Sequence, residues 1–158
     1  MSTTARRPGP PAGAPTAPSR VDPRGQRFSA ALTAALLVVA LAASPSTLTT
    51  VLVGLQLLVF AAGSLLGPAR TPYSLVFRTL VRPRLGAPRE LEDAAPPRFA
   101  QTVGLGFAAV SLVGYLAGAT AVGAVAAGFA LAAAFLNAAF GFCLGCELYL
   151  IGKRATAR

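Results

Sequence analysis

The sequence predicts an all-α integral membrane protein with four transmembrane helices arranged as two hairpins. The first observation is composition, because 54% of the 158 residues are hydrophobic and 12% are charged, whereas about a quarter of a soluble domain is charged. The second is charge placement: the 14 Lys and Arg residues fall into the blocks 6–27, 70–98 and 153–158, and long apolar segments separate the blocks. Positive charge marks the cytoplasmic side of a membrane protein, so both termini and the central loop are predicted to be cytoplasmic.

The net charge of +9 has two readings. In a soluble protein it would suggest nucleic-acid binding, because clustered Lys and Arg neutralise phosphates. Here the charges flank apolar spans, no basic stretch is interleaved with stacking aromatics, and the chain contains no Trp. The expected partner is therefore the lipid bilayer and not a nucleic acid.

The first two spans are predicted from helix-start and turn signals. Residues 1–21 are rich in Pro, Gly and Ala and are predicted to be a disordered cytoplasmic tail. Asp22 can cap a helix and Pro23 suits its first turn, so a first span is expected over 24–43. A second is expected over 48–67, after a Ser-Pro-Ser-Thr turn. A cleaved signal peptide is the alternative for the first span, but the short turn favours a hairpin.

The central loop is predicted to contain a short amphipathic helix on the membrane surface. A Thr-Pro pair at 71–72 can start it. Arg78 and Arg82 lie four residues apart, opposite an apolar face, as in an interfacial helix. Pro83 is expected to end it. Residues 84–98 are predicted to form an extended cytoplasmic loop, either a solvated connector or a docking site for a partner.

The last two spans are predicted over 99–118 and 123–148. The apolar run that holds the fourth span would extend about 46 Å as a single helix, longer than a hydrocarbon core of about 30 Å. The helix must therefore tilt strongly, start nearer Val125, or break around 141–145. A short tail, 155–158, completes the chain, so that residues 22–154 form the membrane domain.

Most of the reactive groups within the spans lie at the end of the fourth. Both cysteines of the chain, Cys143 and Cys146, are there and Glu147 follows them. On one continuous helix these three residues would lie opposite the face that carries Asn137. The cysteines are candidates for a redox pair and Glu147 for its acid or base, while Asn137 and Tyr149 are weaker candidates for substrate binding.

The spacing of the cysteines permits several chemistries. Two thiols three residues apart can form a disulfide or share a thiophilic ligand, while a neighbouring carboxylate opposes thiolate formation but can accept a proton. Haem attachment and a structural zinc site are disfavoured, because the chain contains no His and two thiolates fall short of four ligands. No metal or cofactor is therefore predicted. The alternative is that both cysteines are small packing residues.

Two further patterns concern packing rather than chemistry. Gln56 and Tyr115 are isolated polar residues in the spans and are interpreted as helix contacts. Glycine pairs four residues apart favour close approach of helix backbones without defining an oligomeric state; they are Gly63 with Gly67, Gly114 with Gly118, and Gly141 with Gly145.

Four segments resemble a known family: Val21-Asp-Pro-Arg-Gly-Gln-Arg-Phe28, Arg82-Pro-Arg-Leu-Gly86, Pro97-Arg-Phe-Ala-Gln101 and Phe135-Leu-Asn-Ala-Ala-Phe-Gly-Phe-Cys-Leu-Gly-Cys-Glu-Leu-Tyr149. They are similar to the bacterial membrane family catalogued as domain of unknown function 4395, over about Val21 to Arg154. The resemblance implies a multi-pass protein of the bacterial inner membrane. It also implies a soluble thioredoxin-like or sulfurtransferase partner.

Three functions are consistent with these patterns. The leading hypothesis is a membrane component of thiol–disulfide or sulfur metabolism, in which Cys143 and Cys146 cycle between dithiol and disulfide or carry a sulfane sulfur. The alternatives are a small oligomeric transporter or permeability factor, and a scaffold whose basic loop docks a soluble partner. Hydrolase and nucleotide-driven activities are disfavoured, because His and a phosphate-binding glycine loop are missing from the sequence.

Overall fold

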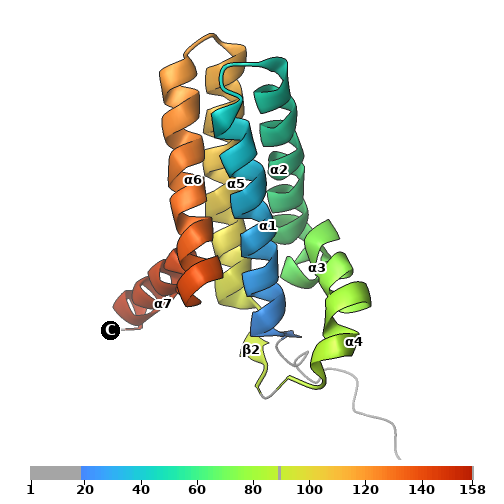
Figure 1. Cartoon of the computed structure of the whole chain (residues 1–158). Coiled ribbons are helices and arrows are strands. Elements are labelled where there is room, and N and C mark those ends of the chain that lie inside the picture. The colour runs from blue at the N-terminus through green and yellow to red at the C-terminus, as the bar shows by residue number, and fades with distance from the viewer. Residues whose placement is uncertain (1–18, 89, 158) are drawn as a thin grey trace, which may run out of the picture.

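The structure is a computed structural model that describes residues 19–88 and 90–157. Within those residues four helices are long and apolar enough to cross a membrane: α1 (Pro23–Ala42), α2 (Thr47–Leu66), α5 (Ala95–Leu116) and α6 (Thr120–Phe140). They form one bundle (Figure 1), in which α1 packs against α6, and α5 packs against both α2 and α6. The predicted fold class, an all-α protein with four apolar spans, is confirmed.

The two ends of the bundle differ. Short turns join α1 to α2 and α5 to α6 at one end, while the opposite end carries all the other elements (Figure 1). We call this opposite end the basic end. Its elements are β1 (Arg20–Val21), η1 (Pro68–Arg70), α3 (Pro72–Val76), the π-helical η2 (Phe77–Val81), α4 (Arg82–Leu85), β2 (Glu92–Asp93) and α7 (Leu144–Thr156).

The helix starts follow the local signals. Asp22 caps α1 by accepting a hydrogen bond from the Arg24 backbone N–H at 3.0 Å, with Pro23 in the first turn. The first two spans therefore begin within one residue of their predicted starts. α5 begins at Ala95, four residues before the predicted 99. Its two prolines fit the first turn because backbone N–H groups have no intrahelical partner there.

The predicted disordered tail, 1–21, lies mostly outside the described residues. Its last part is ordered, because Arg20–Val21 pairs antiparallel with Glu92–Asp93 and the Ala94 N–H donates to the Ser19 carbonyl at 2.9 Å. Val21 is only 7% exposed. Residues 19–21 are therefore tied to the segment just before α5, whereas the sequence predicted that order begins at Asp22.

The predicted helix in the central loop begins where expected, at Pro72, but ends later than expected. Thr71 caps α3 by accepting from the Ser74 N–H at 3.1 Å, and Arg78 and Arg82 are exposed. The prediction that Pro83 ends the helix is wrong, since helical structure continues to Leu85. In the π turn before Pro83, the Arg82 N–H donates five residues back to Phe77, and this wider turn accommodates a proline ring that would clash in a regular helix.

The fourth helix breaks, which was one of the three options for its excessive length. α6 ends at Phe140, and Gly141 adopts a left-handed conformation with φ of 70° that glycine tolerates best. The Gly141 N–H donates to Asn137 O at 3.0 Å and closes the helix end. The predicted fourth span, 123–148, therefore divides at Gly141, and the chain turns into a separate helix, α7.

Candidate functional site

The two cysteines form a disulfide at the start of α7. Cys143 is the residue that caps this helix, and its Sγ accepts a hydrogen bond from the Cys146 N–H at 3.3 Å. The Cα atoms of Cys143 and Cys146 are 5.2 Å apart and their sulfurs are bonded. A capping residue and the residue three positions later lie on the same side of a first helical turn, which brings the sulfurs together.

α7 is held across the start of α5, so the disulfide has a fixed position relative to the bundle (Figure 1). The contact is close at Gly145, where a Cβ atom would lie 2.6 Å from the Ala100 Cα. The rings of Phe99 and Tyr149 pack next to it with centroids 5.8 Å apart. Only glycine permits this approach of the two helices.

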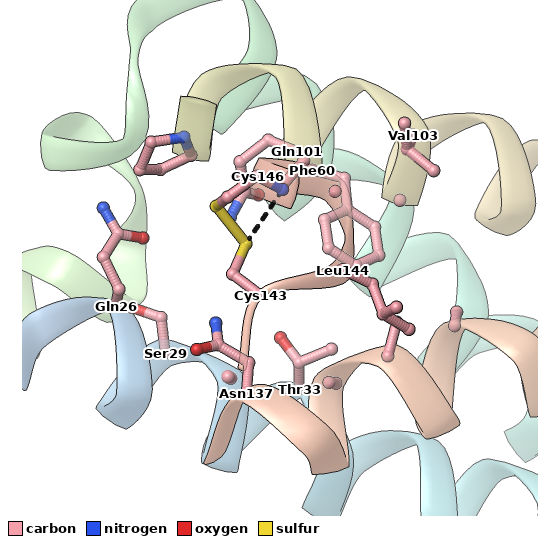
Figure 2. Close-up of a pocket in the computed structure, with 18 of the residues that line it drawn as sticks. Gln26, Ser29, Thr33, Phe60, Gln101, Val103, Asn137, Cys143, Leu144 and Cys146 are labelled. Atoms are coloured by element: carbon pink, nitrogen blue, oxygen red, sulfur yellow. Dashed lines mark hydrogen bonds between the residues drawn. A yellow bond between two sulfur atoms is a disulfide. The ribbon is translucent and has the colours of Figure 1, made fainter. Parts of the chain in front are cut away.

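The disulfide borders a cavity of about 380 Å³ that extends between the four long helices. Figure 2 shows its residues at this end. The deeper part is lined by aromatic rings and small side chains, among them Phe107, Phe129 and Ala130. The end near the disulfide combines the apolar side chains of Phe60 and Leu144 with polar side chains from α1, α5 and α6: Ser29, Thr33, Gln101 and Asn137.

Arg27 fixes the end of α6 immediately before the cysteine loop. Its guanidinium donates to the carbonyl of Ala138 at 3.1 Å and to that of Ala139 at 3.2 Å. These carbonyls belong to the last turn of α6, where no intrahelical N–H groups are left to pair with them. This turn is also the negative end of the helix dipole. Arg27 also lines the cavity that the disulfide borders.

Two more arginines act in the same way at the basic end. Arg98 of α5 donates to the carbonyls of Ser64 and Leu65, which end α2, at 2.7 and 3.0 Å. Arg24 of α1 donates to the carbonyls of Leu85 and Gly86 at the end of α4 at 3.3 and 3.2 Å. From the sequence, these charges were expected to set the membrane topology and to contact lipid. The structure adds a helix-capping role, which depends on contacts distant in sequence.

A buried polar chain lies beside the cavity. Gln56 is 0% exposed; its Nε2 donates to Thr33 Oγ1 at 3.3 Å, and its Oε1 accepts from the Tyr73 hydroxyl at 3.0 Å. Burial raises the pKa of Tyr73 above its ordinary 10.0, so this hydroxyl stays protonated and remains a donor. Gln56 is thus a helix contact, as the sequence predicts, and it links α1, α2 and α3.

Two buried oxygens at the cavity have no hydrogen-bond partner among the described residues: Ser29 Oγ and Gln101 Oε1. Ser29 is 8% exposed, and both residues line the cavity. Buried polar atoms are nearly always paired, so these two are the strongest sign of a ligand site. Sequence reasoning did not select them, although Gln101 closes one of the segments that carry the family resemblance.

The structure brings some of the predicted site residues together and separates others. Asn137, Cys143 and Cys146 all line the cavity, because the break at Gly141 turns the cysteines back toward the bundle. The expected placement of Asn137 opposite the cysteines is therefore wrong. Glu147 is exposed in the first turn of α7 and Tyr149 packs on Phe99; neither is among the residues that line the cavity.

The remaining predictions concern the surface and metals. Arg78 and Arg82 lie on the exposed side of the central helical segment, and neither lines the cavity. Among residues 19–88 and 90–157, no three His, Cys, Asp or Glu side chains group together as a metal site would require.

Comparison with known proteins gives one match. The model of the family described as Domain of unknown function (DUF4395) matches residues 21–154, which include the four long helices, the disulfide and nearly all of α7. Neither a curated protein nor a solved structure is significantly similar to the chain.

Proposed function

We propose that this protein, which belongs to the DUF4395 family, is a membrane-bound thiol–disulfide redox protein. The observation that carries the proposal is the position of the Cys143–Cys146 disulfide. It lies at the start of a helix and at the border of a cavity, with both cysteines partly exposed. Inert packing cysteines are instead usually buried in apolar surroundings.

The local geometry favours Cys143 as the nucleophile. In the reduced state its thiolate would lie at the positive end of the α7 dipole, with the Cys146 N–H already directed at its sulfur. The Cys143 thiolate attacks a partner disulfide, which forms a mixed disulfide and releases one partner thiol. Cys146 then loses its proton and attacks Cys143 Sγ, which closes the disulfide; the second partner sulfur leaves as a thiolate and takes up a proton. The exposed carboxylate of Glu147 is the nearest acidic group along the chain to accept the Cys146 proton.

We place the protein in the bacterial inner membrane, with both termini and the basic end in the cytoplasm. The support is the arginine distribution and the positive-inside bias. Cytosolic thiols are kept reduced, so a disulfide on this side belongs to a catalytic cycle rather than to a structural brace. The proposed partner is a soluble thioredoxin-like protein or a sulfurtransferase that reaches the cysteines from the water-exposed side of α7.

The test is a redox titration of the purified protein in lipid nanodiscs. The protein is equilibrated with mixtures of reduced and oxidised glutathione, quenched with a maleimide, and its free thiols are counted by mass spectrometry. We expect both thiols to appear together as one two-electron transition. Cys146→Ser should accumulate a mixed disulfide at Cys143, and Cys143→Ser should accumulate much less. Thiols that never exchange with glutathione in a folded protein would refute the proposal.

Transport is the second candidate, and the cavity is the observation that favours it. Asn137 lines the cavity, and Gln56 lies beside it in the polar chain. In liposomes this function predicts flux of a small sulfur-containing or cationic solute that falls in Asn137→Ala. Transport would be rejected, and the redox role retained, if Asn137→Ala left the flux unchanged or if the wild-type protein showed no flux.

A further inference from the structure

The deep part of the cavity has the character of a site for a lipid-soluble molecule. It lies between the apolar spans and is lined by Phe107 and Phe129, whose ring centroids are 5.9 Å apart. Its volume of about 380 Å³ falls within the range of small-molecule pockets. Burial of apolar surface among aromatic rings favours a flat, apolar occupant drawn from the bilayer.

At the end near the disulfide, polar side chains are available to form hydrogen bonds with oxygen atoms of that occupant. Ser29 Oγ and Gln101 Oε1 are buried and unpaired among the described residues, and the amide of Asn137 also reaches this end (Figure 2). A hydroxyl and an amide can each donate and accept a hydrogen bond. They can therefore pair with a ligand oxygen whether it is a carbonyl or a hydroxyl.

The disulfide adds a redox requirement at the same place. Figure 2 shows Cys143 and Cys146 between the Gln101 side and the Asn137 side of the cavity, so an occupant near these amides is also near the sulfurs. Interconversion of a dithiol and a disulfide transfers two electrons and two protons. A quinone meets every condition, because its flat ring has carbonyl oxygens that become hydroxyls when it takes up two electrons and two protons.

We propose that this cavity binds the ring of a lipid-soluble quinone and that the Cys143–Cys146 dithiol reduces it. This inference rests on the proposed redox function and names its membrane co-substrate. A soluble partner dithiol re-forms the Cys143–Cys146 dithiol by the reverse of the exchange described above, giving up two electrons and becoming a disulfide, and the quinone then oxidises the protein again. The S–S bond forms as the two thiols give up two electrons and two protons; the quinone takes them up, and its two C=O groups become C–OH groups. Ser29 and Gln101 are the positioning residues that hold the ring oxygens.

The experiment uses the reduced full-length protein in nanodiscs, without oxygen or free reductant. The probe is a short-chain ubiquinone, whose fully substituted ring leaves no C–H position for thiol addition. Quinone loss is followed by ultraviolet absorbance and thiol loss by maleimide labelling. We expect saturable kinetics with one quinone reduced for every two thiols lost, and no quinone adduct in the protein mass.

Matched variants separate the site from the chemistry. Ser29→Ala and Gln101→Leu should each raise the half-saturating quinone concentration about tenfold, the effect of one lost hydrogen bond to a buried group. Exchange with glutathione should be unchanged in both. Ser64→Ala is the control, since its hydroxyl pairs with Thr102 and Ser64 does not line the cavity. Melting temperatures verify that each variant is folded.

The outcomes distinguish this inference from the proposed function. If glutathione exchange persists but quinone reduction is absent, non-saturable, or unchanged in Ser29→Ala and Gln101→Leu, the quinone site is refuted and the redox role stands. If the cysteines exchange with neither reagent, both proposals fail. Saturable quinone binding to a Cys143→Ser/Cys146→Ser protein that weakens in Gln101→Leu would support the site by itself.

Discussion

Arg27 and Ala138 are 111 residues apart in sequence and are joined by a hydrogen bond of 3.1 Å from the guanidinium to the carbonyl oxygen. The bond ties the first turns of α1 to the last turn of α6, three residues before the left-handed Gly141. The cysteine loop begins there, so its position depends on a charge that precedes it by more than a hundred residues.

Replacing Arg27 with Met should loosen this junction. The change removes the donor to two carbonyls at the end of α6, so we expect a loss of about 1–2 kcal/mol in the free energy of unfolding. It should also speed reduction of the disulfide by a water-soluble phosphine, because the loop after Gly141 is less firmly held. Detergent-unfolding curves and reduction rates measure the two effects.

Arg78→Met is the matched control for this change, because Arg78 is exposed on the central helical segment and lies away from the cavity. Arg78→Met should leave the free energy of unfolding and the rate of disulfide reduction near the wild-type values. Equal effects of the two substitutions would mean that net charge, and not the hydrogen bond to Ala138, determines the result.

Glycine at 145 should be essential for docking of α7, whereas glycine at 152 should not. An added Cβ at Gly145 would lie 2.6 Å from Ala100 Cα, whereas at Gly152 nothing lies within 4 Å. Gly145→Ala should therefore shift α7 and expose Cys146, which raises the rate of its alkylation in the reduced protein. Gly152→Ala, on the same helix, should stabilise it by about 0.5–1 kcal/mol through helix propensity. Similar behaviour of the two variants would contradict the packing of α7 on α5.

The fold was predictable from the sequence where local signals dominate. Apolar length defined the four spans, and Asp22 with Pro23 defined the start of α1, because these depend on neighbouring residues only. Local reasoning failed at Pro83, where a π turn absorbs the proline. It also failed at Arg20–Val21, whose order comes from a strand more than 70 residues away.

Asp22 should give the protein an acid-sensitive component of stability. Burial alone would raise the pKa of its carboxyl, but hydrogen bonds from the Arg24 side chain and backbone, with the Arg24 and Arg82 charges, outweigh burial and hold the pKa below 3.8. A lowered pKa in the folded state stabilises the protein above the unfolded value, and this contribution is lost as pH falls through the folded pKa. Unfolding curves between pH 5 and pH 2, for the wild type and Asp22→Asn, test this.

The neutral asparagine keeps the cap but cannot titrate, so Asp22→Asn should show a weaker pH dependence than the wild type over this interval. Parallel curves for the two proteins would rule out the ion pair with Arg24 as the source. Asp22→Ala should in addition lose about 1 kcal/mol at neutral pH, because it removes the α1 cap.

Tyr73 should ionise later than an ordinary tyrosine. Burial raises its pKa above 10.0, and its hydroxyl donates to Gln56 Oε1. The difference in ultraviolet absorbance between the wild type and Tyr73→Phe isolates its titration, with an expected midpoint above 10. Tyr73→Phe should also destabilise the protein by about 1–3 kcal/mol, since it leaves a buried amide oxygen unpaired. A midpoint at or below 10 would contradict the buried contact.

The candidate site was predictable only in part. The Cys-x-x-Cys spacing identified Cys143 and Cys146, because paired thiols are rare in apolar spans and carry their own chemistry. Their approach to Asn137 was missed because it requires the turn at Gly141, which reverses the face expected for a continuous helix. Ser29 and Gln101 were missed because a polar residue on a helix is revealed as unpaired only when its neighbours from other helices are known.

The most direct test of the redox role is a gel-shift alkylation of Cys143 and Cys146 in intact cells and in inverted membrane vesicles. A membrane-impermeant maleimide is applied before and after reduction, with Cys143→Ser and Cys146→Ser as single-thiol controls. We expect labelling from the cytoplasmic face only, and a fraction of the protein that is labelled only after reduction and that grows under oxidant or sulfur stress. Two thiols that remain reduced and unlabelled under every condition would contradict it and identify the cysteines as packing residues.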